Sequence, residues 1–235
     1  MESLHRRDGV DVCDVHWARV DRARAALAEL LDDDERARRE RFARAGDRSR
    51  FTVAAALLRV VAGELLDTDP REVAVDRTCA RCGAQHGRPR IAGGVLHASV
   101  SHSGDYAAVA VTRAGPVGVD VERVRPLDHG ALADDVCAPQ ERAAIASLAA
   151  FHVLWTRKES ALKATGAGLT LPLEEVVVSD PAAPPRLLAL PGDGAPAAQM
   201  ADLRPAAGYA AAATVLTAAP VAFRQRRADA RLAGL

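Results

Sequence analysis

The chain contains almost no lysine. Of its 31 lysine and arginine residues, only Lys158 and Lys163 are lysines, and both lie in the stretch RKESALK at 157–163. Arginine presents a wide planar fork, whereas lysine presents a compact ammonium on a flexible stem, so the two are not interchangeable at a binding site. The stretch that keeps lysine is therefore a candidate for a site that needs a point charge.

Aromatic residues and net charge are also scarce. Aromatic residues make up 3% of the chain, and the formal net charge is zero. The first value argues against base-stacking platforms, and the second argues against nucleic acid as a partner. The remaining composition, 49% hydrophobic and 26% charged over 235 residues, is typical of a globular protein with a sizeable core.

Long apolar runs are missing too. The first 20 residues carry scattered charges and no apolar segment of a secretory signal, and the most apolar late segment, 208–219, is too short to span a bilayer. The four cysteines, only two of them close together, do not form a disulfide scaffold. We therefore expect a cytoplasmic protein with no membrane partner.

The hydrophobic patterns predict an α+β protein. A helix, a break and a second helix are expected within 32–66, with Asp47 as a cap, and another helix within 139–166, with Gly166 as its stop. Alternating residues predict strands at 9–20 and 117–124, and two short strands within 97–113 around a turn at 103–105. Four further segments, 173–180, 185–190, 199–205 and 209–216, predict an antiparallel meander.

The two halves of the chain follow a similar order. Each has a helix with a charged start, at 38–66 and 140–165, followed by strands. This order predicts two pseudo-symmetric α/β lobes, mostly antiparallel, with one long helix each. We place the first lobe at 1–115 and the second at 116–223, followed by a loosely ordered basic tail at 224–235.

Two carboxylates alternate along the expected strand GVDVERV. Asp120 and Glu122 are two residues apart, so they share one strand face, while Val119 and Val121 face the core. Adjacent carboxylates are stable in water or around a hard cation such as Mg²⁺. The pair taken alone is more typical of a solvated strand face than of a metal site.

A polar stripe follows on the expected helix WTRKESALK. Trp155, Glu159 and Lys163 are spaced four residues apart and share one face. An ordinary surface Glu–Lys pair is the simpler interpretation, but the tryptophan draws the same stripe toward a packed environment. Together with the acidic strand, the stripe indicates a lined cleft.

Two shorter segments complete the set. In SVSHSG, His102 lies among Ser99 and Ser101 and before Gly104, a combination suited to an anion, although a turn histidine is an equally good interpretation. In HGRPR, Arg88 precedes Pro89 in an extended basic segment that suits a phosphate.

The order GRP, SVSHSG, GVDVE, WTRKESALK resembles the 4′-phosphopantetheinyl transferases, in particular the larger two-lobed type that activates nonribosomal peptide and polyketide synthases. The resemblance rests on the strand 117–122, the helix 155–163 and the segment RERFARAGDRSRF, and it extends from about residue 38 to 172. It implies that the chain has the fold of that family and acts as a monomer.

The resemblance also implies an activity. The family moves phosphopantetheine from coenzyme A to a serine of an apo carrier protein and releases adenosine 3′,5′-bisphosphate. Mg²⁺, or Mn²⁺ in its place, is then expected on Asp120, Glu122 and Glu159. Glu159 is the expected general base, Asp120 is the other expected catalytic carboxylate, and Lys163 is expected on a phosphate oxygen.

The resemblance further implies contacts to coenzyme A. The residues expected to bind it are Arg38, Arg50, Arg88, Pro89, Ser101, His102 and Lys163. The sequence departs from the pattern in two places. Some relatives carry two lysines before the Arg-Phe segment, where this chain has Glu35 and Arg38, and the connector between Asp120 and Trp155 is shorter than in familiar relatives.

Two other functions remain possible from the residues. An acidic strand followed by Glu-x-x-x-Lys also suits a metal-dependent nuclease or phosphodiesterase. A non-catalytic relative that only binds carrier proteins is the third hypothesis. Cys79, Cys82 and His86 have spacing that could bind Zn²⁺, but no fourth ligand is evident and one CxxC is only half of a usual site, so the sequence favours a reduced pair in a turn over a metal site.

Overall fold

The computed structural model describes residues 9–79, 81–91, 94–126, 129–168, 171–192 and 194–234. Its architecture is α+β with mostly antiparallel sheets, as predicted. The strands are β1 (Asp11–Arg19), β2 (Val75–Thr78), β3 (Gln85–Ile91), β4 (His97–Ser103), β5 (Tyr106–Thr112), β6 (Val117–Arg123), β7 (Val177–Val178), β8 (Leu187–Ala189), β9 (Gln199–Leu203), β10 (Tyr209–Val215) and β11 (Val221–Arg227). The α-helices are α1 (Ala25–Ala28), α2 (Asp33–Glu40), α3 (Ala45–Leu66), α4 (His129–Val136), α5 (Leu148–Thr165) and α6 (Asp229–Ala233).

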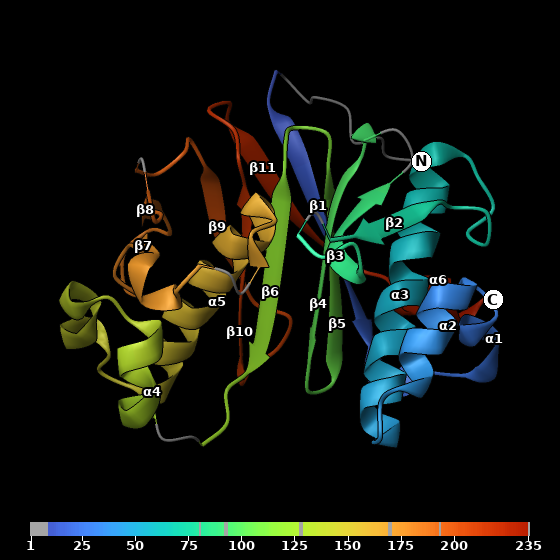
Figure 1. Ribbon diagram of the computed structural model, residues 1–235, viewed down its shortest axis with the longest axis horizontal. Helices are drawn as coiled ribbons and strands as arrows, with labels where there is room; N and C mark the ends of the chain where they lie inside the picture. The colour runs from blue at the N-terminus through green and yellow to red at the C-terminus, as the bar shows by residue number, and fades with distance from the viewer. Residues whose placement is uncertain are drawn as a thin grey trace.

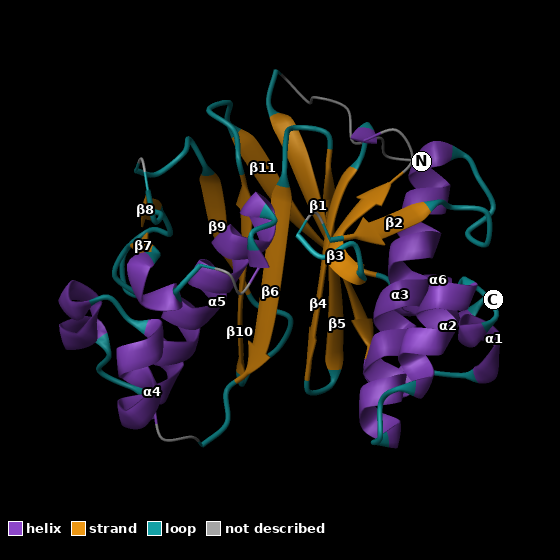
Figure 2. Cartoon of the chain, viewed as in Figure 1, coloured by secondary structure: helices purple, strands orange, loops and turns teal. Residues whose placement is uncertain are grey.

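Two main sheets stand side by side in the middle of the molecule (Figure 1). The first has the strand order β11-β1-β5-β4-β3-β2, and the second has the order β6-β10-β9. Helices α1, α2, α3 and α6 lie on one side of these strands, and α4 and α5 lie on the other (Figure 2). One long helix therefore packs on each sheet: α3 on β1, β4 and β5, and α5 on β6 and β10.

The two sheets share a hydrophobic core. Buried residues of β1 and β5, such as Trp17 and Ala110, form one cluster with Val119 and Val121 of β6 and with Ala213 of β10. Val119 and Val121 therefore face the core, as their alternation predicts. A second cluster lies beneath α3, whose middle from Phe51 to Gly63 is buried. Because burial of apolar surface dominates folding stability, the shared cluster joins the two halves into one folded unit.

Helix ends differ in part from the prediction. The break between α2 and α3 is present, but α3 begins at Ala45, so Asp47 lies in its first turn and is not the cap. The expected helix at 139–166 is divided into a 3₁₀ turn, Pro139–Ala144, and α5, which Ser147 caps by accepting a hydrogen bond from the Ala150 amide at 3.1 Å. Gly166 ends α5 with a φ of 78°, as predicted.

The expected meander is wrong as a single unit. β7 pairs only with β8 in a small separate sheet, while β10 pairs with β6 on one side and β9 on the other. Strand patterns show that each segment is extended, but they carry no information about which segments pair.

The expectation of a loosely ordered tail is also wrong. β11 pairs in parallel with β1 of the first lobe, and α6 follows it. Asp14 of β1 is buried and accepts hydrogen bonds from Arg224 at 2.7 and 2.9 Å, so the basic residues of this segment meet an acidic partner that is distant in sequence. The C-terminal strand therefore completes the first sheet, while the division near residue 115 stays a prediction.

Candidate functional site

Serine side chains of β4 connect the two sheets. The hydroxyls of Ser99, Ser101 and Ser103 accept hydrogen bonds from backbone amides of β6, at 3.0, 3.4 and 3.1 Å. Successive odd positions of a strand face one side, so all three hydroxyls point at β6. This arrangement gives the serines of SVSHSG a different role from the expected anion cradle, because their hydroxyls hold the neighbouring strand.

The same serines orient the two carboxylates of β6. Ser101 donates to Oδ1 of Asp120 at 2.9 Å, and Ser103 donates to Oε2 of Glu122 at 2.8 Å. Lys163 of α5 completes the group, because its Nζ lies 2.6 Å from Oδ1 of Asp120 and 3.1 Å from Oγ of Ser101. Asp120 is 3% exposed, so the alternative of a solvated strand face is wrong for this residue.

A close approach of α5 to β6 places Lys163 and Glu159 beside Asp120. A Cβ added to Gly118 would lie 1.9 Å from the backbone oxygen of Ser160. Any other residue at this position would push the helix away from the strand. The glycine of the GVDVE motif therefore sets the distance between the helix stripe and the acidic strand.

One cavity of about 360 Å³ is lined by residues from both sides of the predicted division near residue 115. The lining residues after residue 115 are Asp120, Glu122, Trp155, Glu159 and Lys163, so residues of the helix stripe and of the acidic strand line the same cavity. We call this set the acidic wall, since three of its five members are carboxylates.

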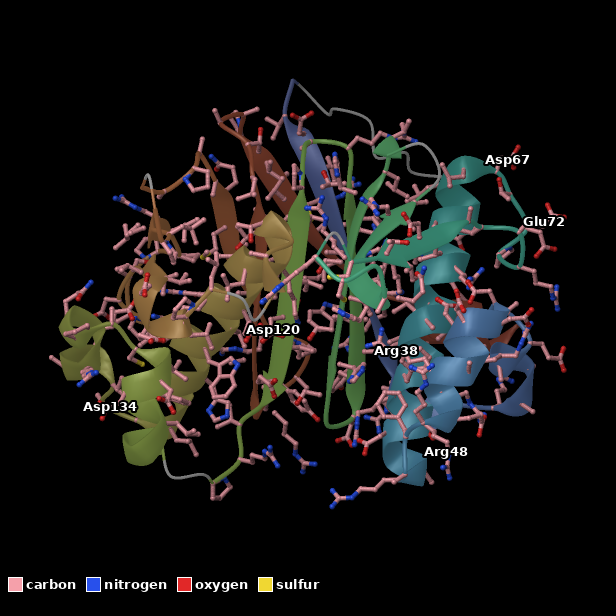
Figure 3. The ribbon with its side chains drawn as sticks, in the orientation of Figure 1. Arg38, Arg48, Asp67, Glu72, Asp120 and Asp134 are labelled. Carbon is pink, nitrogen blue, oxygen red and sulfur yellow. The ribbon has the colours of Figure 1, made fainter. Side chains whose placement is uncertain are left out.

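The wall of the cavity formed by residues before 115 is basic. Its charged or titratable members are Arg38 of α2, Arg77 of β2 and His102 of β4, and we call it the basic wall. Figure 3 shows Asp120 at the central strands and Arg38 on the α2 side. Arg38 stacks on the ring of Phe51, with 5.4 Å from its Cζ to the ring centroid. The cavity therefore separates two walls of opposite charge.

Burial shifts the pKa values of both walls. The pKa of Glu159 and that of Glu122 are raised, first by desolvation and then by the charge of Asp120. The pKa of His102 is lowered, first by desolvation, with Lys163, Arg50 and Arg38 acting in the same direction. The carboxylates are thus destabilised as anions, and the histidine is held neutral, in the absence of a ligand.

Three residues expected to bind coenzyme A lie outside the cavity lining. Arg50 pairs with Asp47 on α3 and donates to the Gly104 carbonyl at 3.5 Å. Arg88 of β3 donates to the Ala164 carbonyl near the end of α5 at 2.8 Å, across the junction of the lobes. Pro89 follows it as a buried residue.

Comparisons with known proteins agree with this arrangement. The family described as the 4′-phosphopantetheinyl transferase superfamily matches residues 116–214, and the family described as 4′-phosphopantetheinyl transferase, N-terminal, matches residues 15–114. HetI of Nostoc sp., a 4′-phosphopantetheinyl transferase, is 34% identical over 70% of this chain and 72% of its own length. The chain belongs to the 4′-phosphopantetheinyl transferase superfamily.

Other relatives in this superfamily align over similar shares. A 4′-phosphopantetheinyl transferase of Bacillus subtilis is 30% identical over 67% of this chain and 68% of its own length. The Synechocystis sp. protein slr0495 is 34% identical over 63% of this chain, and the match spans 62% of that protein, which is less than two thirds of its length.

In this member of the superfamily, Glu35 turns away from the cavity. It is buried, and its Oε2 accepts from Nε of Arg59 at 2.6 Å, while Asp32 pairs with the same guanidinium. The position where some relatives carry a lysine is therefore part of an internal ion-pair network and not of the basic wall.

Arg77 is the functional candidate that the sequence did not reveal. It lines the cavity, and its Nε is buried with no hydrogen-bond partner among the described residues. Burial is the main cause that lowers the pKa of Arg77. In the sequence it is one arginine in the short polar segment VDRT, and no motif distinguishes it from the many others. A buried donor without a partner normally has one in the functional state, so Arg77 is suited to an anionic ligand.

The two lysines turn out to have separate roles. Nζ of Lys158 is fully buried, 2.5 Å from Oε2 of Glu141, and donates to the carbonyls of Leu173 at 3.0 Å and Val176 at 2.6 Å. Only Lys163 of the pair lines the cavity. The two lysines of this stretch therefore differ in role: Lys158 forms buried contacts inside the protein, and Lys163 lines the cavity.

The acidic wall fits a hard divalent cation. Oδ2 of Asp120 is buried with no partner among the described residues, although a carboxylate oxygen in that position normally has one. The raised pKa values of Glu122 and Glu159 show that added positive charge would stabilise both anions. Mg²⁺ keeps several waters and takes only one or two carboxylates together with substrate phosphates, so the three groups need not converge on one point.

Among the parts of the chain that the structure describes, no helix is long and apolar enough to cross a bilayer.

Proposed function

We propose that this cavity transfers 4′-phosphopantetheine from coenzyme A to a serine hydroxyl of an apo carrier protein in the presence of Mg²⁺. The serine oxygen forms a bond to the phosphorus that carries the pantetheine arm, and the bond from that phosphorus to the pyrophosphate bridging oxygen breaks. The serine proton goes to a base, and adenosine 3′,5′-bisphosphate leaves. Carrier domains of nonribosomal peptide and polyketide synthases are the proposed partners.

The observation that carries this proposal is the opposition of the two walls across one cavity. A pyrophosphate ester needs charge neutralisation and positioning above all. The basic wall offers Arg38, Arg77 and His102 to the anionic nucleotide end. The acidic wall offers Asp120, Glu122 and Glu159 to the cation that accompanies the pyrophosphate. A bound Mg²⁺ would neutralise phosphate charge and stabilise the charge that develops on the leaving group.

Glu159 is the proposed general base. Its pKa is raised by burial and by Asp120, and this makes it a better proton acceptor than an exposed glutamate. Trp155 precedes it by one helical turn on the same wall and shields that side of the cavity from water. The serine proton reaches Glu159 directly or through one water.

Lys163 is proposed to act as a positioning and charge-stabilising residue. Its Nζ already lies within hydrogen-bond distance of Asp120 and Ser101, so the side chain is held in place before any ligand binds. An ammonium has three donors, and two are used here, so the third can reach a phosphate oxygen.

A mass-spectrometric assay tests the proposal. Purified chain, an apo carrier protein, coenzyme A and Mg²⁺ should give a carrier protein heavier by one phosphopantetheinyl group on its serine. Omission of Mg²⁺, or a carrier with that serine replaced by alanine, should abolish the gain. A carrier protein that binds but gains no mass would indicate a binding relative, and cleavage of a phosphodiester without transfer would indicate a nuclease or phosphodiesterase.

The site is also proposed to be complete in one chain and to act in the cytoplasm as a monomer. Both walls come from described residues of the same chain, with the basic wall before the predicted junction near residue 115 and the acidic wall after it. If the activity per chain fell when the protein was diluted, the active form would be an oligomer and the proposal of a monomer would be wrong.

A further inference from the structure

The turn that joins β2 to β3 brings two cysteines and a histidine together. Sγ of Cys79, Sγ of Cys82 and a ring nitrogen of His86 all lie within 4.8 Å of one another. Among the residues that the structure describes, this is the one group of three histidine, cysteine or acidic side chains that converges so closely. The proposed transfer reaction uses none of the three.

The backbone of this turn is arranged around the first cysteine. The amide of Cys79 donates to the Ala84 carbonyl at 2.8 Å, and the amide of Gly83 donates to the Cys79 carbonyl at 2.9 Å. Gly83 has a φ of 74°, which a residue with a side chain rarely adopts.

The third group is already in contact with the second. Sγ of Cys82 lies 3.0 Å from Nε2 of His86. In a tetrahedral zinc site, with Zn–S near 2.3 Å and Zn–N near 2.0–2.1 Å, neighbouring ligand atoms lie roughly 3.5–3.8 Å apart. The distances between these three ligand atoms would therefore have to change by only about 1 Å for the group to hold an ion.

We propose that Cys79, Cys82 and His86 form a Zn²⁺ site with three protein ligands. Two thiolates and one imidazole are the ligand types that zinc prefers, and a water completes the tetrahedron. The carboxylates that would favour a hard cation such as Mg²⁺ are not part of this group. The site is distinct from the acidic wall, which presents oxygen ligands only.

The position of the site in the hairpin indicates its role. Arg77 of the basic wall lies two residues before Cys79, and Arg88, which contacts the end of α5, lies two residues after His86. The pairing of β2 with β3 is irregular between Asp76 and Thr78, so the ladder alone does not fix the register there. An ion that ties Cys79 to His86 would fix both strands where they carry these arginines.

The primary test measures metal and not activity. The untagged chain is reduced, stripped with a chelator, loaded with Zn²⁺ and dialysed, and zinc is then measured by elemental analysis. We expect one ion per chain, and Co²⁺ in place of zinc should give the intense thiolate-to-cobalt absorption bands. Cys79→Ser, Cys82→Ser and His86→Asn should each lower zinc affinity at least about tenfold, that is about 1.4 kcal/mol.

Matched substitutions elsewhere serve as controls. Cys137→Ala and His97→Asn change the same residue types outside the turn and should keep the full zinc content. Circular dichroism spectra check that each variant is folded. If a cysteine variant does not fold, protection of the two turn thiols from alkylation in zinc-loaded wild type gives the same information. Wild type that retains no zinc, or zinc content unchanged in all three turn variants, would overturn the proposal.

A second measurement tests the role of the ion. Hydrogen exchange in residues 75–91 should slow when zinc is added, and this should not occur in His86→Asn. If the proposed transferase function is right, the KM for coenzyme A should also rise in the zinc-free protein, with little change in kcat. The KM measurement rests on the proposed transferase function, whereas the zinc-binding and hydrogen-exchange measurements do not. Failure of the zinc site can therefore be told from failure of the proposed function.

Discussion

The two walls of the cavity differ in how the chain builds them. The acidic wall comes from two short continuous segments, β6 and α5, and the carboxylates of β6 are held by the hydroxyls of β4. The basic wall draws one residue from each of three separate elements, α2, β2 and β4. Its arginine Arg77 has a buried Nε with no partner among the described residues. Each wall therefore keeps one buried polar atom without a partner among the described residues, Oδ2 of Asp120 and Nε of Arg77, but only the acidic wall has its carboxylates oriented by neighbouring hydroxyls.

The largest effect is expected where the acidic wall is broken. Asp120→Asn keeps the size of the side chain but removes the charge that faces the cation, and it leaves Lys163 without its ion-pair partner. Loss of one preorganised charge at a reacting phosphate costs roughly 100–1000-fold in rate. The carrier-protein assay, run with saturating Mg²⁺, measures this loss.

The exposed Asp134→Asn serves as its control, because its side chain is 75% exposed and lies away from the cavity. It should be as active as wild type. Retention of more than a few per cent of the wild-type rate in Asp120→Asn, or in Glu159→Ala, would show that the assignment of metal ligands is wrong.

A smaller loss is expected where the shape but not the charge of the acidic wall changes. Lys163→Arg replaces a compact ammonium, held by Asp120 and Ser101, with a wider guanidinium. We expect the rate of transfer to fall about tenfold or more, since each 1.4 kcal/mol of lost transition-state stabilisation is a factor of ten. The reverse exchange on the surface, Arg142→Lys, should leave the rate unchanged. Full activity of Lys163→Arg would show that the reaction does not require lysine at this position.

The basic wall should respond in binding and not in chemistry. Arg77→Met removes the donor but keeps a long apolar stem, so the KM for coenzyme A should rise about tenfold, the effect of losing one hydrogen bond to a charged group, while kcat stays nearly constant. Because the buried Nε of Arg77 has no partner among the residues that the structure describes, thermal stability should be unchanged or higher.

Arg90→Met tests the same hairpin without touching the cavity, because Arg90 is exposed and pairs with Asp76. Its KM should equal that of wild type. A fall in kcat without a change in KM for Arg77→Met would show that Arg77 does not bind the nucleotide end of coenzyme A.

The smallest effect concerns the stability of the metal-free protein as a function of pH. The pKa of Glu159 is raised in the folded state, so its contribution to stability is fully present below the ordinary glutamate pKa and is lost as pH rises through the raised value. At neutral pH the ionised carboxylate therefore destabilises the fold. Glu159→Gln should raise the melting temperature there by about 1–2 °C, because the side chain remains partly in contact with water.

Lowering the pH should close this difference. Below about pH 3 the wild-type carboxyl is protonated in both states, and the two melting temperatures should coincide. The exposed Glu72→Gln should show no difference at either pH. A stabilising effect of Glu159→Gln that persisted at acid pH would show that the charge of Glu159 is not its cause.

The sequence predicted the acidic wall better than the basic wall for a physical reason. Residues two apart on a strand and four apart on a helix must share a face, so Asp120 with Glu122, and Glu159 with Lys163, could be grouped from spacing alone. No local rule relates Arg38, Arg77 and His102, because they meet only through folding. Arg77 was therefore missed, and Arg50 and Arg88, expected on the strength of the resemblance, lie outside the cavity lining.

Local signals determined the element types, the stop at Gly166, the inward-facing valines of β6 and the membership in the transferase superfamily, because these follow from backbone geometry and short motifs. The tertiary structure alone decided that β11 pairs with β1, that the serines of β4 hold β6, and that Lys158 is buried against Glu141 while Lys163 faces the cavity. Each of these depends on a partner far away in the chain. Spacing along a sequence constrains only near neighbours, whereas the pairing of distant segments is set by how apolar surface and buried charges can be satisfied together.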